Sequence, residues 1–381
     1  MLGPHHRTQG VRQQFRTGWA RARTDHRGRP AAQGPFRPAA VSPAKKALMW
    51  KCSVVTRESP VDARCWAGFS DRVLGIGVGH GVSEVEVPAD TWPKFTSVGG
   101  VLAVLRGDSL DLRDGKDGGL RVQVPAPFAS DVRASNRRFW LDEDGRARPV
   151  SIDGQQGEPV ELRGAHGLVA ASDRWLAGRE AEAFDNSTIK VVSTSGAKGV
   201  VLTTPSLANP TSAAFTADGL VVAHNGGIQC WPLDGQPPRL IHKAPVRLGL
   251  VQILPTDVGP DHPDWYVFCE DVLSETTMAT GEIRGGFRPV QVTGSIESRL
   301  TRFSEGQPVG ERIIEGRALG LAFEAGLLWV LTSKTKSDDL YGGAGPVECR
   351  ILDDRLDDVG VVDFGDADWR GGFAVCSGQP I

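Results

Sequence analysis

The sequence predicts an all-β repeat fold, on three observations. A phrase made of turn residues, an apolar strand and a second turn recurs eight times in the 381 residues. The recurrences are mostly thirty to sixty residues apart, which is typical of architectures whose units bury their apolar faces only against one another. Apolar residues at helical spacing never continue beyond a turn or two. The eight phrases begin at Ser70, Gly99, Ser135, Ser172, Ala217, Pro263, Glu324 and Gly371.

Each unit reads as four strands joined by turns, most clearly in residues 211–242. There the strands SAAF, LVVA, IQCWPL and RLIH alternate with the turns TADG, HNGG and DGQPP. β-Branched and aromatic residues favour the strands, and Gly, Asp, Asn and Pro favour the turns. Four-stranded sheets set radially around an axis form a β-propeller. Five further units fit the same template, the last two with long insertions: 95–125, 131–162, 166–203, 249–315 and 318–364.

The two ends of the chain decide the number of blades. Residues 65–87 supply three strands and lack a fourth, and the C-terminal segment GFAVCS provides a strand that fits the gap. Joining the ends in one sheet hides open strand edges, so the sequence predicts seven blades of four antiparallel strands, closed by the N- and C-terminal strands. If GFAVCS and WKCSVV instead form a separate sheet, the ring has eight blades.

One unit carries a family likeness. Phe215, Ala217-Asp218-Gly219, Ile228, Trp231 and Asp234 fall where WD-type repeats place these residues, and Leu319–Phe323 with Leu328-Trp329 looks similar. The chain therefore resembles the broad WD40 and YVTN-type propeller superfamily at the level of single repeats. The Gly-His dipeptide of that family is missing, and no unit ends in Trp-Asp. The resemblance implies the fold and a tendency to bind partners, and no particular activity.

The first 48 residues differ from the rest in composition. They hold eight Arg and two Lys against one acid, with abundant Pro and Gly and no strand alternation. Such a segment cannot bury enough surface to fold alone, so it is predicted to be a disordered basic extension preceding a propeller of residues 49–381. Two alternatives stay open. Met49 is the true start, or the Arg-rich stripe around Val11, Phe15 and Trp19 is a transit peptide.

Charge excludes one class of partner. Without the basic extension, the whole-chain totals of 43 basic and 46 acidic residues become 33 and 45, a net charge of −12. Nucleic-acid affinity depends largely on Lys and Arg that neutralise phosphates, so nucleic acid is not expected as a partner. No apolar run reaches the roughly 18 residues of a membrane helix, so no membrane association is expected.

The six cysteines lie far apart, without metal-site spacing. We interpret them as buried thiols of a cytoplasmic protein, although Cys52 and Cys376 would be near enough to pair where the ring closes. No metal site and no cofactor are expected. Asp142–Gly145 begins like a calcium loop, but Arg146 falls where an oxygen ligand is needed, so a hairpin turn is predicted instead.

Six strand tryptophans recur with the repeat and are predicted to fill the core between sheets: Trp66, Trp140, Trp175, Trp231, Trp265 and Trp329.

Three connections between second and third strands are unusually long: 179–187, 271–297 and 333–345. In the four-strand scheme these connections emerge on one face of the disc, and the second includes a predicted hairpin in GEIRGGFRPVQV. Loops on a rigid scaffold frequently carry function. The candidate partner-binding residues are Glu180, Glu182, Asp185, Glu275, Arg284, Phe287, Lys334, Lys336, Asp338, Asp339 and Tyr341.

The sequence therefore predicts a monomeric, non-enzymatic scaffold that binds a protein or peptide through the face with the long loops. Catalytic residues are unknown, since no nucleophile elbow, zinc-protease or nucleotide-binding motif is present. A propeller hydrolase or lactonase with a central metal is the alternative, and a propeller docked flat into a larger assembly is a third reading.

Overall fold

The computed structural model describes only part of the chain. The described residues are 63–69, 72–77, 82–87, 93–182, 186–195, 199–225, 227–242, 251–255, 264–271, 277–279, 290–292, 297–334 and 343–377. Contacts divide the chain between Leu48 and Met49, and the second unit is described here by itself. The first 48 residues and Cys52 lie outside the described residues, so the predictions for them stay predictions.

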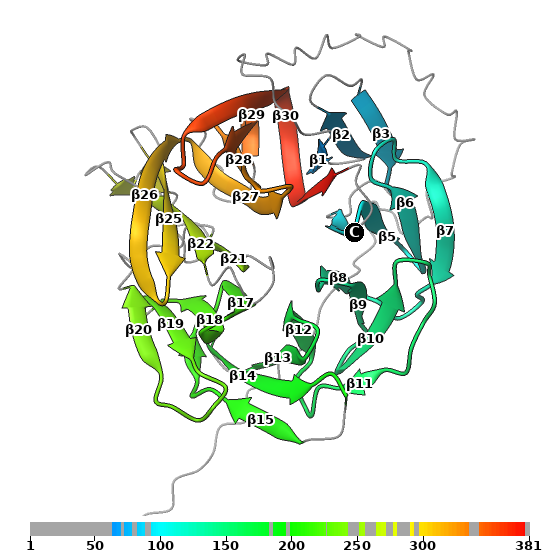
Figure 1. The fold of residues 1–381 in the computed structure, drawn as a ribbon, viewed down its shortest axis with the longest axis vertical. Coiled ribbons are helices and arrows are strands. Elements are labelled where there is room, and N and C mark those ends of the chain that lie inside the picture. Colours follow the sequence, from blue (N-terminus) through cyan, green and yellow to red (C-terminus); the bar gives the residue numbers. More distant parts are fainter. Residues whose placement is uncertain are drawn as a thin grey trace, which may run out of the picture. The chain divides into compact units, whose positions relative to one another are not determined.

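The described strands form four-stranded antiparallel blades, arranged around a ring in Figure 1. Blade 1 consists of β4 (Lys94–Val98), β5 (Val101–Arg106), β6 (Ser109–Asp114) and β7 (Leu120–Pro125). Blade 2 consists of β8 (Asp131–Ala134), β9 (Arg138–Asp142), β10 (Arg146–Ser151) and β11 (Val160–Glu161). Blade 3 consists of β12 (Gly167–Ala171), β13 (Trp175–Ala181), β14 (Asn186–Ser193) and β15 (Val200–Thr203), and β16 (Leu207–Ala208) adds to β14.

Blades 4 and 5 follow the same order. Blade 4 consists of β17 (Ser212–Thr216), β18 (Gly219–His224), β19 (Gly227–Trp231) and β20 (Arg239–His242). Blade 5 consists of β21 (Val251–Pro255), β22 (Trp265–Asp271), β25 (Glu297–Ser304) and β26 (Gln307–Glu315). Between β22 and β25 a separate two-stranded sheet is inserted, formed by β23 (Thr277–Ala279) and β24 (Val290–Val292).

A single long strand is shared by the last two blades. β30 (Asp358–Ser377) pairs through its first part with β29 (Gly343–Leu352), completing blade 6 behind β27 (Arg317–Glu324) and β28 (Leu327–Ser333). Its last part pairs with β1 (Ala63–Phe69), followed by β2 (Arg72–Gly77) and β3 (Val82–Glu86). Blade 7 therefore takes its innermost strand from the C-terminal part of the chain and its other three from the N-terminal part, as predicted.

The innermost strands fix the count at seven within the described chain. β4, β8, β12, β17, β21, β27 and β30 each contact the innermost strand of the next blade, and β30 contacts β4 to complete the circle. The eight-bladed alternative is therefore wrong.

Two side chains hold the closing strand on either side. Ser97 in blade 1 donates its hydroxyl to the Val375 carbonyl at 2.7 Å, and Glu324 in blade 6 accepts the Ser377 amide at 3.2 Å.

The hairpin turn predicted at Asp142–Gly145 is confirmed. Asp144 and Gly145 both have positive φ, 48° and 86°, which is the backbone of a type I′ turn. This turn suits the right-handed twist of the strands, and the Glu143 amide donates to the Arg146 carbonyl at 2.9 Å. Ala325-Gly326 between β27 and β28 repeats the pattern with φ of 53° and 76°.

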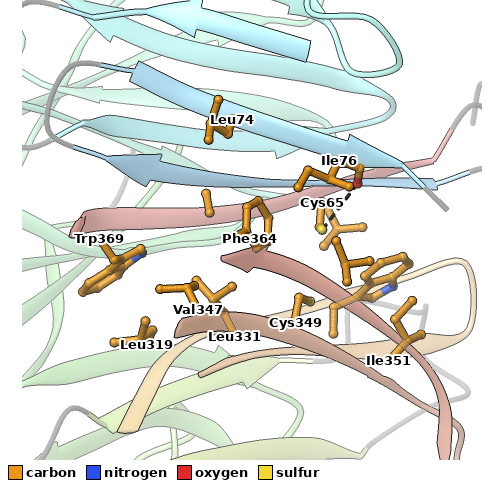
Figure 2. Packing of buried hydrophobic residues seen from close by; sticks show 14 of the residues in the cluster. Cys65, Leu74, Ile76, Leu319, Leu331, Val347, Cys349, Ile351, Phe364 and Trp369 are labelled. Atoms are coloured by element: carbon orange, nitrogen blue, oxygen red, sulfur yellow. Dashed lines mark hydrogen bonds between the residues drawn. The ribbon is translucent and has the colours of Figure 1, made fainter. Parts of the chain in front are cut away.

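The core lies in layers between neighbouring blades. Figure 2 shows the layer between blades 6 and 7, where Leu319, Leu331 and Val347 of blade 6 belong to the same buried apolar cluster as Leu74 and Ile76 of blade 7. Five of the six strand tryptophans are buried and Trp175 is half-buried, which confirms their predicted core role. The buried members are Trp66, Trp140, Trp231, Trp265 and Trp329.

Two further findings complete the fold. The described cysteines are free thiols, four of them buried, so the buried-thiol interpretation is confirmed for Cys65, Cys230, Cys349 and Cys376, with Cys269 half-buried. Among the described residues, no helix is long and apolar enough to cross a bilayer.

Candidate partner-binding face

Antiparallel blades place their connections on two opposite faces of the disc. Connections from second to third strand, and from the fourth strand to the next blade, share one face, which we call the insertion face. Its most distinctive feature is the β23–β24 hairpin, which interrupts blade 5 between β22 and β25. The hairpin was predicted, but its first strand, Thr277–Ala279, precedes the predicted segment GEIRGGFRPVQV.

The strands beneath this hairpin are firmly paired. β22 and β25 pair without a register shift, from Trp265 opposite Phe303 to Asp271 opposite Glu297. Trp265 stacks on Phe303 with ring centroids 4.3 Å apart, and both side chains are buried. The hairpin is therefore joined to a rigid support, which is the usual arrangement for a functional loop.

Blade 6 contributes the neighbouring connection. It leaves β28 at Ser333 and returns in β29 at Gly343, next to blade 5 in the ring. The prediction that insertions 271–297 and 333–345 come from adjacent blades is confirmed. Of the candidate residues in these two connections, the structure describes Lys334. The following candidates lie outside the described residues: Asp185, Glu275, Arg284, Phe287, Lys336, Asp338, Asp339 and Tyr341.

Lys334 is already engaged within its own blade. Its ammonium group lies 3.0 Å from the Glu348 carboxylate, and its backbone amide donates to the Pro346 carbonyl at 3.0 Å. Glu348 also pairs with Arg350, and Arg350 lies 3.6 Å from Asp358. The charge of Lys334 is therefore partly neutralised before any partner arrives.

The third predicted loop, 179–187, is wrong in its extent. β13 continues to Ala181 and β14 begins at Asn186, so Glu180 lies in a strand opposite Thr188. The Ser187 side chain supports the pairing, since Arg179 donates its guanidinium Nε to the Ser187 hydroxyl at 2.7 Å. β13 and β14 therefore take up residues 179–181 and 186–187 of the predicted connection.

The two glutamates of this hairpin make local contacts. Glu180 forms an ion pair with Lys190 at 2.7 Å. Glu182 accepts hydroxyl hydrogen bonds from Ser206 at 2.6 Å and from Thr188, which lower the pKa of its carboxyl. Glu182 thereby ties the hairpin end to the segment leading into β16. Both residues belong to blade 3, whereas Lys334 belongs to blade 6, so these three lie on one face in different sectors.

Sequence reasoning considered Asp142 only as the start of a turn and missed its burial on the insertion face. Asp142 ends β9 opposite Asp131, and its Oδ2 accepts the Leu168 amide of blade 3 at 3.0 Å. Burial raises the pKa of Asp142, and the charge of Asp131 adds to the increase. Its Oδ1 is buried without a hydrogen-bond partner among the described residues. Only the register of β8 and β9 could have revealed this pair.

The described part of the chain contains no group of three or more His, Cys, Asp or Glu side chains that could hold a metal ion. The described histidines His166 and His224 belong to no such group. His166 lies 3.4 Å from Asp144 at the surface, and burial lowers the pKa of His224 beside Trp231.

No protein-family model and no curated protein sequence matches this chain. Solved structures are similar to it in fold. AztD from Citrobacter koseri is 12% identical, over 84% of this chain and 99% of that chain, with a TM-score of 0.45. BBS1N, crystallised in complex with ARL6DN, is 11% identical over 82% and 90%, with a TM-score of 0.49. BamB from Moraxella catarrhalis is 14% identical over 75% and 92%, with a TM-score of 0.40. At such low identities the likeness concerns the propeller fold alone.

Proposed function

We propose that this protein is a non-enzymatic propeller scaffold that binds a protein or peptide through its insertion face. The observation that carries the proposal is the β23–β24 hairpin. Blade 5 has its four strands without the hairpin, which forms its own two-stranded sheet and adds nothing to the hydrogen-bonded ladder of the blade. An addition that the fold does not require is best explained by a role in recognition.

The neighbouring connection of blade 6 supports the same sector. Blades 5 and 6 are joined by side chains as well as by packing: Arg312 of β26 donates to the Leu356 carbonyl and pairs with Asp358 of β30. Arg302 of β25 similarly bonds the Asp354 carbonyl at 2.6 Å. These contacts hold the two blades together. A partner that contacts both insertions therefore does not have to meet the entropic cost of fixing blade 5 relative to blade 6.

A loop exchange in the full chain tests the proposal. In the test variant, residues 274–294 are replaced by a short Gly-Ser turn, which β22 and β25 can accommodate because Asp271 and Glu297 pair directly. In the control variant, the turn Asp234–Pro238, between β19 and β20 on the opposite face, is replaced by Gly-Ser of equal length. Equal melting temperatures would show that both variants retain the fold.

Affinity capture from native lysate, followed by quantitative mass spectrometry, then compares the three proteins. We expect partners that are captured by the wild-type chain and the control, and lost from the variant without the hairpin. Identical partners in all three samples would contradict the choice of face. The hydrolase alternative stays a hypothesis, since no contact in the described chain specifically favours it.

A further inference from the structure

Three arginines lie exposed at two neighbouring turns on the face opposite the insertion face. Arg137 and Arg138 lie at the turn between β8 and β9 of blade 2, and Arg174 lies in the turn between β12 and β13 of blade 3. Most described arginines form an ion pair with a carboxylate, as Arg113 does with Asp111. Within the described ranges, the three arginines at these turns form no such pair. Their charges are therefore available to a partner.

The two turns are built alike. In blade 2 the Ser135 amide donates to the Arg138 carbonyl at 3.0 Å, and in blade 3 the Ser172 amide donates to the Trp175 carbonyl at 2.8 Å. The Ser172 hydroxyl also accepts the Trp175 amide at 3.0 Å. In both turns the third residue is an arginine. Because hydrogen bonds close both turns, little backbone ordering is left for a partner to impose.

The two turns also lie side by side. They follow β8 and β12, which are neighbouring innermost strands of the ring (Figure 1), and β9 contacts β12 as well. Packed sheets lie about 10 Å apart. Arg138 lies on the side of blade 3, since its guanidinium carbon is 5.8 Å from the ring centroid of Trp140, which shares an apolar cluster with Leu168. We call Arg137, Arg138 and Arg174 the arginine patch.

The arginine patch contrasts in charge with the rest of the propeller. Residues 135–138 and 172–175 hold three Arg and one Asp, a net charge of +2, whereas residues 49–381 hold 33 basic and 45 acidic residues, a net charge of −12. Trp175 directly follows Arg174 and is half-buried, whereas the other five strand tryptophans are buried. Arg and Trp are among the residue types that contribute most to binding energy at protein interfaces.

We propose that the arginine patch binds an acidic peptide segment of a partner protein, as a second site beyond the insertion face. A guanidinium group pairs with a carboxylate through two parallel N–H···O bonds. An extended chain advances about 3.3 Å per residue, so two acidic residues about three positions apart span the distance between the turns. Three arginines are few for a nucleic acid, whose binding depends on neutralising many phosphates.

Fluorescence anisotropy with the full chain tests the proposal. The probe is a fluorescein-labelled peptide of four Glu-Ser-Ser repeats, which places an acid at every third position. The Arg137→Gln/Arg174→Gln double variant should bind it about fivefold more weakly than the wild-type chain, because two exposed ion pairs are lost. Increasing salt should weaken wild-type binding, because the pairs are exposed.

The matched control is the Arg163→Gln/Arg355→Gln double variant. Both arginines are exposed and form no ion pair in the described chain, so the control loses the same net charge away from the patch. It should bind the peptide as the wild-type chain does. Equal weakening in both variants, or no binding to the wild-type chain, would overturn the proposal. An oligothymidylate of equal length that binds more tightly than the peptide would overturn the assignment of the ligand.

Hydrogen exchange of the wild-type chain provides a second readout that does not depend on any variant. Saturating peptide should slow exchange in segments 134–139 and 171–176, which cover the two turns, and should leave segment 323–328 in blade 6 unchanged. Slower exchange in one of the two turns without the other, or in neither, would overturn a site shared by blades 2 and 3.

Discussion

Asp111 is the most completely enclosed carboxylate in the described chain, with its side chain 1% exposed. It accepts hydrogen bonds from Arg113 at 2.7 Å, from Gln123 at 3.0 Å and from Arg106 at 3.2 Å. Burial alone would raise the pKa of Asp111, but these hydrogen bonds outweigh it and hold the pKa below its usual value. The ionised form is therefore built into blade 1.

Asp111→Asn is expected to lower the free energy of unfolding by about 2 kcal/mol at neutral pH, because two guanidinium groups lose their buried counter-charge. A folded pKa below the unfolded value means that this stabilisation is complete above about pH 4 and is lost as the pH falls through the folded pKa. Urea unfolding of both proteins between pH 7 and pH 3 measures the difference, which should shrink in acid.

Asp114→Asn is the matched control on the same strand. Asp114 pairs with Arg121 at 2.6 Å, but these side chains are 36% and 45% exposed. Solvent screening limits such pairs to about 0–1 kcal/mol, so the control should lose much less stability than Asp111→Asn. Equal losses in the two variants would show that burial of Asp111 has been misread.

Asp142 predicts the opposite sign. Its folded pKa is raised, chiefly by burial, so the charged form is less favourable in the folded protein than in the unfolded chain. At any pH above the folded pKa, ionised Asp142 therefore lowers the free energy of unfolding. Asp142→Asn removes the charge, and the amide oxygen can still accept the Leu168 amide, so stability at pH 7 should rise by up to about 1 kcal/mol. A marked loss in thermal or urea unfolding would contradict this sign.

Trp66 and Trp140 allow a comparison of one hydrogen bond. Both indoles are buried. The guanidinium carbon of Arg64 lies 5.9 Å from the Trp66 ring centroid, and that of Arg138 lies 5.8 Å from the Trp140 ring centroid. The Trp66 Nε1 donates to the Gly115 carbonyl at 2.9 Å, whereas the Trp140 Nε1 has no partner among the described residues. Trp66→Phe should therefore cost about 1 kcal/mol more than Trp140→Phe in urea unfolding. Equal costs would show that the hydrogen bond is not stabilising.

At this scale the sequence indicates burial better than it indicates partners. The tryptophans recur with the repeat, so their place in the core follows from pattern alone. The partners of Asp111 follow from the register of β6 with β5 and β7, which brings Arg106 and Gln123 beside it. Register depends on turn geometry and packing that a single sequence does not display.

Individual strands follow the repeat closely, because alternating apolar residues and turn residues determine them locally. The predicted units 95–125 and 131–162 correspond to strands spanning 94–125 and 131–161. The eight phrases give seven blades for a simple reason: the first phrase is β2 and the last is in β30, and both belong to blade 7. Each recurrence marks one strand, and blade 7 contains two of the marked strands.

The hairpin of β13 and β14 shows where local reading fails. Its Glu- and Ala-rich segment has weak strand propensity, yet pairing extends to Ala181 and Ser187. Tertiary contacts explain the difference, because β16 adds to β14 at Asn186 and Ser187. β16 itself is two residues long and has no sequence signal.

Glu182→Ala should loosen β16 without unfolding the blade. The Glu182 carboxylate accepts the Ser206 hydroxyl at 2.6 Å, directly before β16, so its removal frees that segment. Hydrogen-exchange mass spectrometry should show faster exchange in a peptide covering 204–211. Glu180→Ala is the control, because Glu180 pairs with Lys190 and not with Ser206. Faster exchange in both variants, or in neither, would contradict this role of Glu182.

For the whole molecule, closure is the feature on which stability depends. An open ring would leave two sheet edges and two apolar blade faces exposed, and blade 7 covers them with strands from both ends. The sequence showed this because one unit lacked a strand and the other end supplied it. Partner, ligand and the orientation of the long insertions are not encoded in the repeat, so they do not follow from it.

Hydrogen exchange of the two terminal strands tests closure most directly. If β1 and the last part of β30 complete blade 7, peptides covering 63–69 and 371–377 should be as strongly protected as the inner strands of blades 1 to 6, and should lose protection together as denaturant rises. Rapid exchange of either peptide in native buffer, while the other six blades stay protected, would show that the ends do not close the ring.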